Sequence, residues 1–122
     1  RQMCIRDRNK DDVVKACLIT KDAIETYPFK DKTYSEYAVI RHKSNNKWFA
    51  LVFHLEGELY LNLKCTPLDG AILRDNYDFI TPAWHMNKAH WIKVEVNKCP
   101  SDLLKNLITA SYKLTEVKRR IK

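Results

Sequence analysis

The fold is decided by the stretch LYLNLKCTPLD, residues 59–69. Its first seven residues alternate, so that three leucines and Cys65 share one face of a strand and the residues between them share the other. Thr66 can then cap a helix, Pro67 fits the first helical turn, and Asp69 suits the positive helix end. We therefore expect a half-buried strand followed at once by a helix.

The same two periodicities extend outward from this unit. Strands are expected at residues 37–42, 48–55 and 91–96, and residues 44–47 form a hairpin turn because asparagine tolerates positive φ. Residues 21–32 are predicted to form a loop. A further short strand near residues 81–86 is considered but not assigned. Three helices are expected. The first is capped by Asp11 or Asp12 and buries Val13, Val14, Cys17 and Leu18, and the second runs from Thr66 to about Asn76 and buries Leu68, Ala71 and Ile72. The third follows Pro100 and has an inward stripe of Leu103, Leu104, Leu107, Ile108, Ser111 and Tyr112.

This pattern predicts an α+β fold of two layers, in the order α-β-β-β-α-β-α. Hairpins and alternating strands indicate an antiparallel sheet with its helices packed on one face. The expected core between sheet and helices contains Phe49, Leu51, Leu61, Leu63, Leu104 and Ile108. Residues 48–55 are apolar on both faces, so we expect a loop or a second subunit to cover the other side of that strand.

Composition is typical of one globular domain. The 122 residues are 45% hydrophobic and 30% charged, and no apolar run approaches the roughly 20 residues that span a bilayer. With no signal-peptide pattern, a cytoplasmic location is expected. The four cysteines (Cys4, Cys17, Cys65 and Cys99) form no close pair, so reduced thiols are favoured over disulfides or a metal site, with Cys17 and Cys65 as core residues.

Residues 1–8 resemble the translation of a sequencing adapter and are expected to lie outside the fold, which leaves residues 9–122 as the domain. They carry three arginines and one aspartate, so the formal net charge falls from +7 to +5 without them. A basic chain favours anionic partners such as nucleic acid, although the same charge can serve solubility alone.

Three runs in the middle of the chain resemble the MmcQ/YjbR family in order and spacing. They are Leu63-Lys64-Cys65-Thr66-Pro67, Leu73-Arg74-x-x-Tyr77 and, most specifically, Thr81-Pro82-x-x-His85-Met86-Asn87-Lys88-x-His90-Trp91. The resemblance extends over about residues 11–114. It implies a small α/β fold, described as double-winged or likened to bacterial frataxin homologues, and a DNA-binding label. The chain departs from the family at Pro82-Ala83-Trp84, where Pro-Gly-Tyr is usual, and at Lys21-Asp22, where Pro-Gly is usual. Both departures concern loops.

The candidate nucleic-acid site combines lysines with an aromatic ring and a polar loop. Lysines can neutralise phosphates while an indole stacks on an unpaired base. The chosen residues are Lys64, His85, Asn87, Lys88, His90, Trp91 and Lys93. The alternative is structural, with Asn87 and His85 bonding the loop backbone and the sheet face simply solvated. His42 and His54 are expected to be packed or surface histidines.

Sequence-neutral binding of nucleic acid, DNA in the first place, is therefore the leading hypothesis. The second is a protein-interaction module without catalytic activity, in which Trp48, Trp84 and Trp91 anchor a protein partner or a second copy. The third is a small enzyme built on the loop from His85 to His90. We expect no catalytic residue, metal or cofactor. The two glycines, Gly57 and Gly70, cannot build a phosphate-binding loop, which argues against a nucleotide-dependent enzyme.

Overall fold

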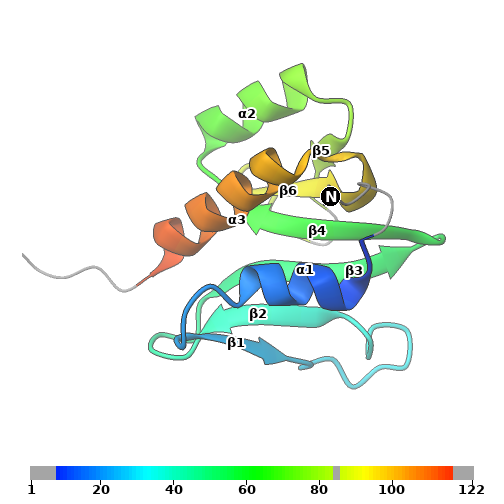
Figure 1. Cartoon of the computed structure of the whole chain (residues 1–122), viewed down its shortest axis with the longest axis vertical. Helices are drawn as coiled ribbons and strands as arrows, with labels where there is room; N and C mark the ends of the chain where they lie inside the picture. Colours follow the sequence, from blue (N-terminus) through cyan, green and yellow to red (C-terminus); the bar gives the residue numbers. More distant parts are fainter. Residues whose placement is uncertain (1–7, 84–85, 117–122) are drawn as a thin grey trace, which may run out of the picture.

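The computed structural model describes residues 8–83 and 86–116, and within them it confirms the predicted α+β fold (Figure 1). The helices and strands are α1 (Lys10–Cys17), β1 (Ala23–Thr26), β2 (Ala38–His42), β3 (Trp48–Leu55), β4 (Glu58–Lys64), α2 (Pro67–Asn76), β5 (Ile80–Pro82), β6 (Trp91–Glu95), the short 3-10 helix η2 (Val96–Lys98) and α3 (Ser101–Thr115). The strands form one six-stranded sheet in the order β1-β2-β3-β4-β6-β5, and every pairing is antiparallel.

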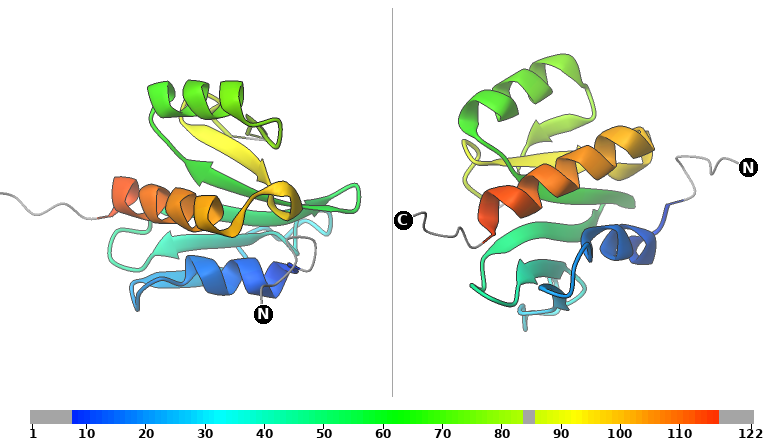
Figure 2. Two further views of the ribbon diagram at one scale, coloured as in Figure 1. Left: turned by 45° about the horizontal axis from the view of Figure 1, so that its top comes forward. Right: turned by 60° about the vertical axis from the view of Figure 1, so that its left-hand side comes forward.

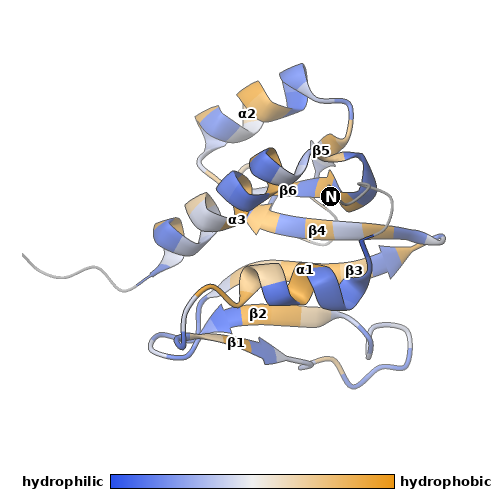
Figure 3. Ribbon diagram, viewed as in Figure 1, coloured by the Kyte–Doolittle hydropathy of each residue, from blue (hydrophilic) through white to orange (hydrophobic). Residues whose placement is uncertain are grey.

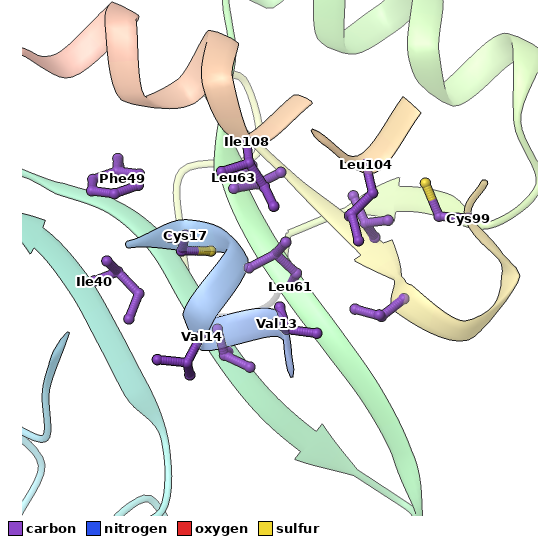
Figure 4. Packing of buried hydrophobic residues seen from close by; sticks show 14 of the residues in the cluster. Val13, Val14, Cys17, Ile40, Phe49, Leu61, Leu63, Cys99, Leu104 and Ile108 are labelled. Atoms are coloured by element: carbon purple, nitrogen blue, oxygen red, sulfur yellow. The ribbon is translucent and has the colours of Figure 1, made fainter. Parts of the chain in front are cut away.

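All three α-helices in the described residues pack on one face of the sheet, as expected. In Figures 1 and 2, α1 and α3 lie side by side across β2, β3 and β4, and α2 lies at the β6–β5 edge. Figure 4 shows side chains of α1 and α3 meeting those of the sheet strands. Val13, Cys17, Leu61, Leu63 and Ile108 are all buried in this core. No helix in the described residues is both long and apolar enough to cross a bilayer.

The start of α1 differs from the prediction. Asn9, not Asp11 or Asp12, is the N-cap: its side chain accepts a hydrogen bond from the amide of Asp12, and the Asp12 carboxylate accepts one from the amide of Asn9. This reciprocal capping box satisfies two amides that a helix end leaves free. Asp12 therefore contributes to the cap from inside the first turn.

Arg8 contradicts the expectation that residues 1–8 are unpacked; residues 1–7 lie outside the described part. The Arg8 guanidinium donates hydrogen bonds to the carbonyls of Val96 and Cys99 at 2.6 and 2.8 Å and to the hydroxyl of Ser101 at 2.8 Å. It thereby links the start of α1 to the start of α3.

The second helix is capped by Thr66 as predicted, but its buried face was predicted wrongly. Leu68 is 69% exposed and Ile72 is 49% exposed, whereas Gly70 is buried. A Cβ atom on Gly70 would lie 2.9 Å from Cys65 Sγ, closer than such atoms approach one another. The close approach of α2 to the sheet explains why a glycine stands inside a helix.

A β-bulge in β3 shifts its alternation of side chains. Ile40 pairs with Ala50, but Arg41 pairs with Trp48, so Phe49 is the extra residue on β3. Phe49 consequently packs with the helix-side core, and Leu51 faces the opposite side. The prediction that Leu51 lies between sheet and helices is therefore wrong, although Leu51 is buried.

Two edge strands complete the sheet. β1 lies within residues 21–32, which were predicted as a loop, and β5 covers part of the segment where a short strand was left open. The remaining strand predictions agree with β2, β3, β4 and β6 to within one residue at each end. The sheet therefore has one face toward the helices and one outer face, on which the predicted site residues of β4 and β6 lie.

Candidate nucleic-acid interface

Cationic and aromatic side chains alternate across one end of the outer face. Arg41 of β2 pairs with Trp48 of β3, and Lys64 of β4 pairs with Trp91 of β6. Leu63 pairs with Ala50, which places the next residue, Lys64, beside the bulge that follows Trp48. Because these strands are neighbours, Arg41, Trp48, Lys64 and Trp91 form a row perpendicular to the strands. We refer to these four residues as the cation–aromatic row.

The predicted pair of Lys64 and Trp91 is brought together by this register. Lys64 Nζ lies 5.9 Å from the centroid of the Trp91 ring, and one step along the strands Lys93 Nζ lies 4.7 Å from the centroid of Tyr60. Such contacts are favourable by about 0.5–1 kcal/mol at exposed sites. The lysine and ring surfaces therefore share one partly exposed patch.

The turn before β6 contributes Asn87, Lys88 and His90 to the same end of the sheet. The amide of Cys65 donates to the His90 carbonyl at 2.9 Å, so the turn is fixed to the end of β4 beside Lys64. Asn87 Oδ1 accepts from the amide of Ala89 at 2.9 Å, which gives the Asn87 oxygen a role inside the turn. Lys88 and His90 are exposed. The predicted site residue His85, together with Trp84, lies outside the described residues.

The middle of the outer face is covered, which the sequence did not reveal. Asn62 points away from the helices, as its place between two inward leucines requires, yet it is fully buried. Its Nδ2 donates to Met86 Sδ at 3.4 Å. Met86 therefore lies over the centre of the sheet and leaves Lys64, Trp91 and Lys93 as the half-exposed part of the patch.

An aromatic cluster, missed in the sequence, covers the outer side of β3. It comprises Phe29, Tyr34, Tyr37, Trp48, Phe53 and Tyr60. The Phe29 ring meets that of Trp48 edge to face at 5.9 Å, and the Tyr37 ring stacks on Phe53 at 5.0 Å. β3 is apolar on both faces, and the expectation that a loop covers its other side is confirmed. Phe29, Tyr34 and Tyr37 belong to the connection between β1 and β2. The density of aromatic residues between residues 27 and 37 was the available signal.

Charge divides the outer face into two ends. The cation–aromatic row and Lys88 lie toward the end of β4, whereas Glu56, Glu58 and Glu95 lie toward its start, near Tyr60, and Lys93 lies between the two groups. Burial, and then these three carboxylates, raise the pKa of the Tyr60 hydroxyl. The positive charges that line up with aromatic rings are therefore concentrated at one end of this face.

On the helix side, Asp22, His42 and Thr115 are linked in the order of a catalytic triad, but their surroundings indicate a structural role. His42 Nδ1 lies 3.2 Å from the Asp22 carboxylate, and Nε2 lies 2.8 Å from the Thr115 hydroxyl. His42 is fully buried between the rings of Phe49 and Tyr112. The Thr115 hydroxyl lies 2.9 Å from a backbone carbonyl in its own helix, to which it donates. His42 is thus packed, as one of the two sequence interpretations held.

The cysteines of the described residues behave as core side chains. Cys17, Cys65 and Cys99 are unpaired and buried, and desolvation raises the pKa of the Cys17 thiol to about 12 and that of Cys99 to about 11. Cys4 lies outside the described residues. No group of three or more His, Cys, Asp or Glu side chains in the described residues is placed to hold a metal ion.

Comparisons with known proteins agree with the fold. A sequence model of the YjbR family matches residues 18–114. The chain is 34% identical over 118 residues to YyaQ of Bacillus subtilis, covering 88% of this chain and 98% of that protein. It is 28% identical over 98 residues to YjbR of Escherichia coli, covering 75% and 83%. Both relatives are named as uncharacterised proteins.

Solved structures give the same result. A Pseudomonas syringae protein superposes with a TM-score of 0.77 at 30% identity, over 89% of this chain and 100% of that one. The Deinococcus radiodurans protein DR2400, whose domain is called DUF419, superposes with a TM-score of 0.75 at 31% identity, over 93% and 81%.

Proposed function

The chain belongs to the YjbR family, and we propose that it binds single-stranded nucleic acid, DNA in the first place, through the cation–aromatic row. The observation that carries this proposal is the alternation of charge and ring along Arg41, Trp48, Lys64 and Trp91. Flat sheet surfaces that carry aromatic and basic side chains suit splayed strands, because every base has a face that can stack.

In this mode of binding the phosphates supply most of the affinity. Lys64 and Lys93 leave their ring contacts to neutralise phosphates, and the exposed Lys88 extends the path along the turn. The Trp91 face that Lys64 gives up then becomes available to a base. Because lysines carry no base code, binding is neutral to sequence and weakens steeply with salt.

The experiment is a titration of labelled oligo-dT and of duplex DNA at two salt concentrations. For wild type we expect tighter binding of the single strand. Lys64→Ala should lower the slope of log affinity against log salt by about 0.7, the value for one phosphate contact on a single strand. Lys105→Ala is the matched control, because Lys105 is an exposed lysine of α3 on the opposite side of the sheet. Equal effects of the two substitutions, or no binding at low salt, would contradict the proposal.

A role as a binding protein rather than an enzyme is part of this proposal, and protein interaction is the second candidate. The observation that favours interaction is the exposed apolar face of α2 at Leu68 and Ile72, of which Ile72 also lines a groove of about 370 Å³ that extends to α3. Figure 3 shows the apolar middle of α2 at the rim of the molecule. Exposed apolar faces of this kind suit contacts with another protein or a second copy.

A further inference from the structure

Trp48 separates two hollows in the outer face. One has a volume of about 400 Å³ and is lined by Phe29, Tyr34, Tyr37, Trp48, Leu51 and Met86. The other has a volume of about 210 Å³ and is lined by Thr26, Tyr27, Pro28, Arg41 and Trp48. We call the first the aromatic pocket and the second the arginine pocket. They share the wall formed by Trp48, which is itself a member of the cation–aromatic row.

The aromatic pocket has the shape and chemistry to hold a flat ring. Phe29 stands edge to face with both Trp48 and Tyr37, at interplanar angles of 89° and 85°, so the walls are rings set at right angles. Leu51, only 4% exposed, contributes an apolar surface to the same pocket. Its volume falls in the range of about 300–1,000 Å³ that is common for small-molecule pockets. Aromatic and aliphatic surfaces of this kind bind planar rings by stacking and edge contacts.

The arginine pocket places a positive charge, that of Arg41, next to the aromatic pocket. Arg41 Nη1 donates to Asn46 Oδ1 at 3.0 Å, which fixes the guanidinium. Arg41 Nε is buried and has no hydrogen-bond partner in the part of the chain that the structure describes. A buried donor without a partner is costly. Arg41 also lines the arginine pocket, where its positive charge favours an anionic oxygen. A neutral apolar occupant would leave this charge without an anionic partner.

We infer that the aromatic pocket takes one unpaired base of a bound single strand, with the adjoining phosphate at Arg41. This inference rests on the proposed function and deepens it, since it assigns one base to a pocket walled by rings while the others lie on the row. The strand then runs from Arg41 past Trp48 to Lys64 and Trp91. The base in the pocket meets rings on more than one side, whereas the base on Trp91 stacks on a single ring.

The test compares two identical substitutions on the same strand. Leu51→Phe puts a ring into the aromatic pocket, whereas Leu55→Phe makes the same change on the same face of β3, four residues away and outside the pocket lining. Loss of one stacked base should weaken oligo-dT binding about tenfold for Leu51→Phe, as removal of a stacking aromatic does. Leu55→Phe should bind as wild type does. Circular dichroism verifies that both variants fold.

Wild-type protein provides a second measurement that needs no variant. In the complex with a short oligo-dT, nuclear Overhauser contacts from a thymine methyl group to ring protons of Phe29 and Tyr37 are expected. Contacts to Trp91 alone, or equal affinities of the two leucine variants, would overturn the pocket while leaving nucleic-acid binding in place. Equal loss in both variants would also overturn it, because the effect would then belong to the whole face. Absence of any oligo-dT binding by wild type would overturn both proposals.

Discussion

Asp22 shows how much one side chain can organise. Its carboxylate accepts hydrogen bonds from the amide and the hydroxyl of Ser44 at 2.9 and 2.7 Å, and it faces the ring of His42. The hydrogen bond from the Ser44 hydroxyl is the main cause that lowers the pKa of Asp22, and burial opposes it. The carboxylate thus joins the segment before β1 to the β2–β3 turn.

The residue-scale prediction is that Asp22→Asn destabilises the protein in a way that depends on pH. A carboxyl group whose pKa is lower in the folded state stabilises the fold above its unfolded pKa of about 3.9, and this contribution is lost as pH falls through the folded pKa. Thermal melts should therefore separate wild type from Asp22→Asn at pH 7, and the gap should close below about pH 4. Asp78→Asn, at an exposed aspartate, is the control. A gap that stays constant down to pH 2 would contradict this account.

At the scale of elements, β4 is the strand on which the fold depends. It pairs with β3 on one side and β6 on the other, and its leucines face the helices. Leu63 is fully buried, so Leu63→Ala should lower the free energy of unfolding by about 2–5 kcal/mol, as measured by urea denaturation. Leu68→Ala, at an exposed position of α2, should change it by less than about 0.5 kcal/mol. Similar losses for both would mean that the assigned burial of these residues is wrong.

The sequence predicts structure well where a local residue pattern determines it. It does not predict structure that depends on contact with a distant part of the chain. The alternation of residues 59–65 and the Thr66 cap are local, and both predictions are confirmed. β1 has only four residues and becomes a strand because β2 lies beside it. The bulge at Phe49 adds one residue without any local mark, so Leu51 was assigned to the wrong face.

The candidate site divides in the same way. The pairing of Lys64 with Trp91 follows from strand register and was anticipated, whereas the covering of Asn62 depends on a segment more than twenty residues away. The row that adds Arg41 and Trp48 requires the complete strand order, because β2 and β6 are not neighbours. The residue pattern of any one β-strand cannot supply that order, and the aromatic pocket was missed for this reason.

At the scale of the whole molecule, Leu68 and Ile72 of α2 are exposed, and Ile72 lines a groove that also reaches Lys64 of the cation–aromatic row. If this face binds a second copy, sedimentation velocity should show concentration-dependent association of wild type. A double substitution, Leu68→Lys with Ile72→Lys, should abolish it, because two charges would have to be buried in the contact. Oligo-dT binding should persist in this variant if the two surfaces are separate. A wild type that stays monomeric at every concentration would exclude self-association through α2.

The two outermost strands of the sheet are also its shortest: β1 has four residues and β5 has three, the last of them Pro82. An outermost strand offers unpaired backbone groups to strands of other molecules, and this template grows with its length. Pro82 lacks an amide hydrogen, which shortens the usable template of β5 further. The margins of the sheet therefore give passing chains little to extend into a fibril.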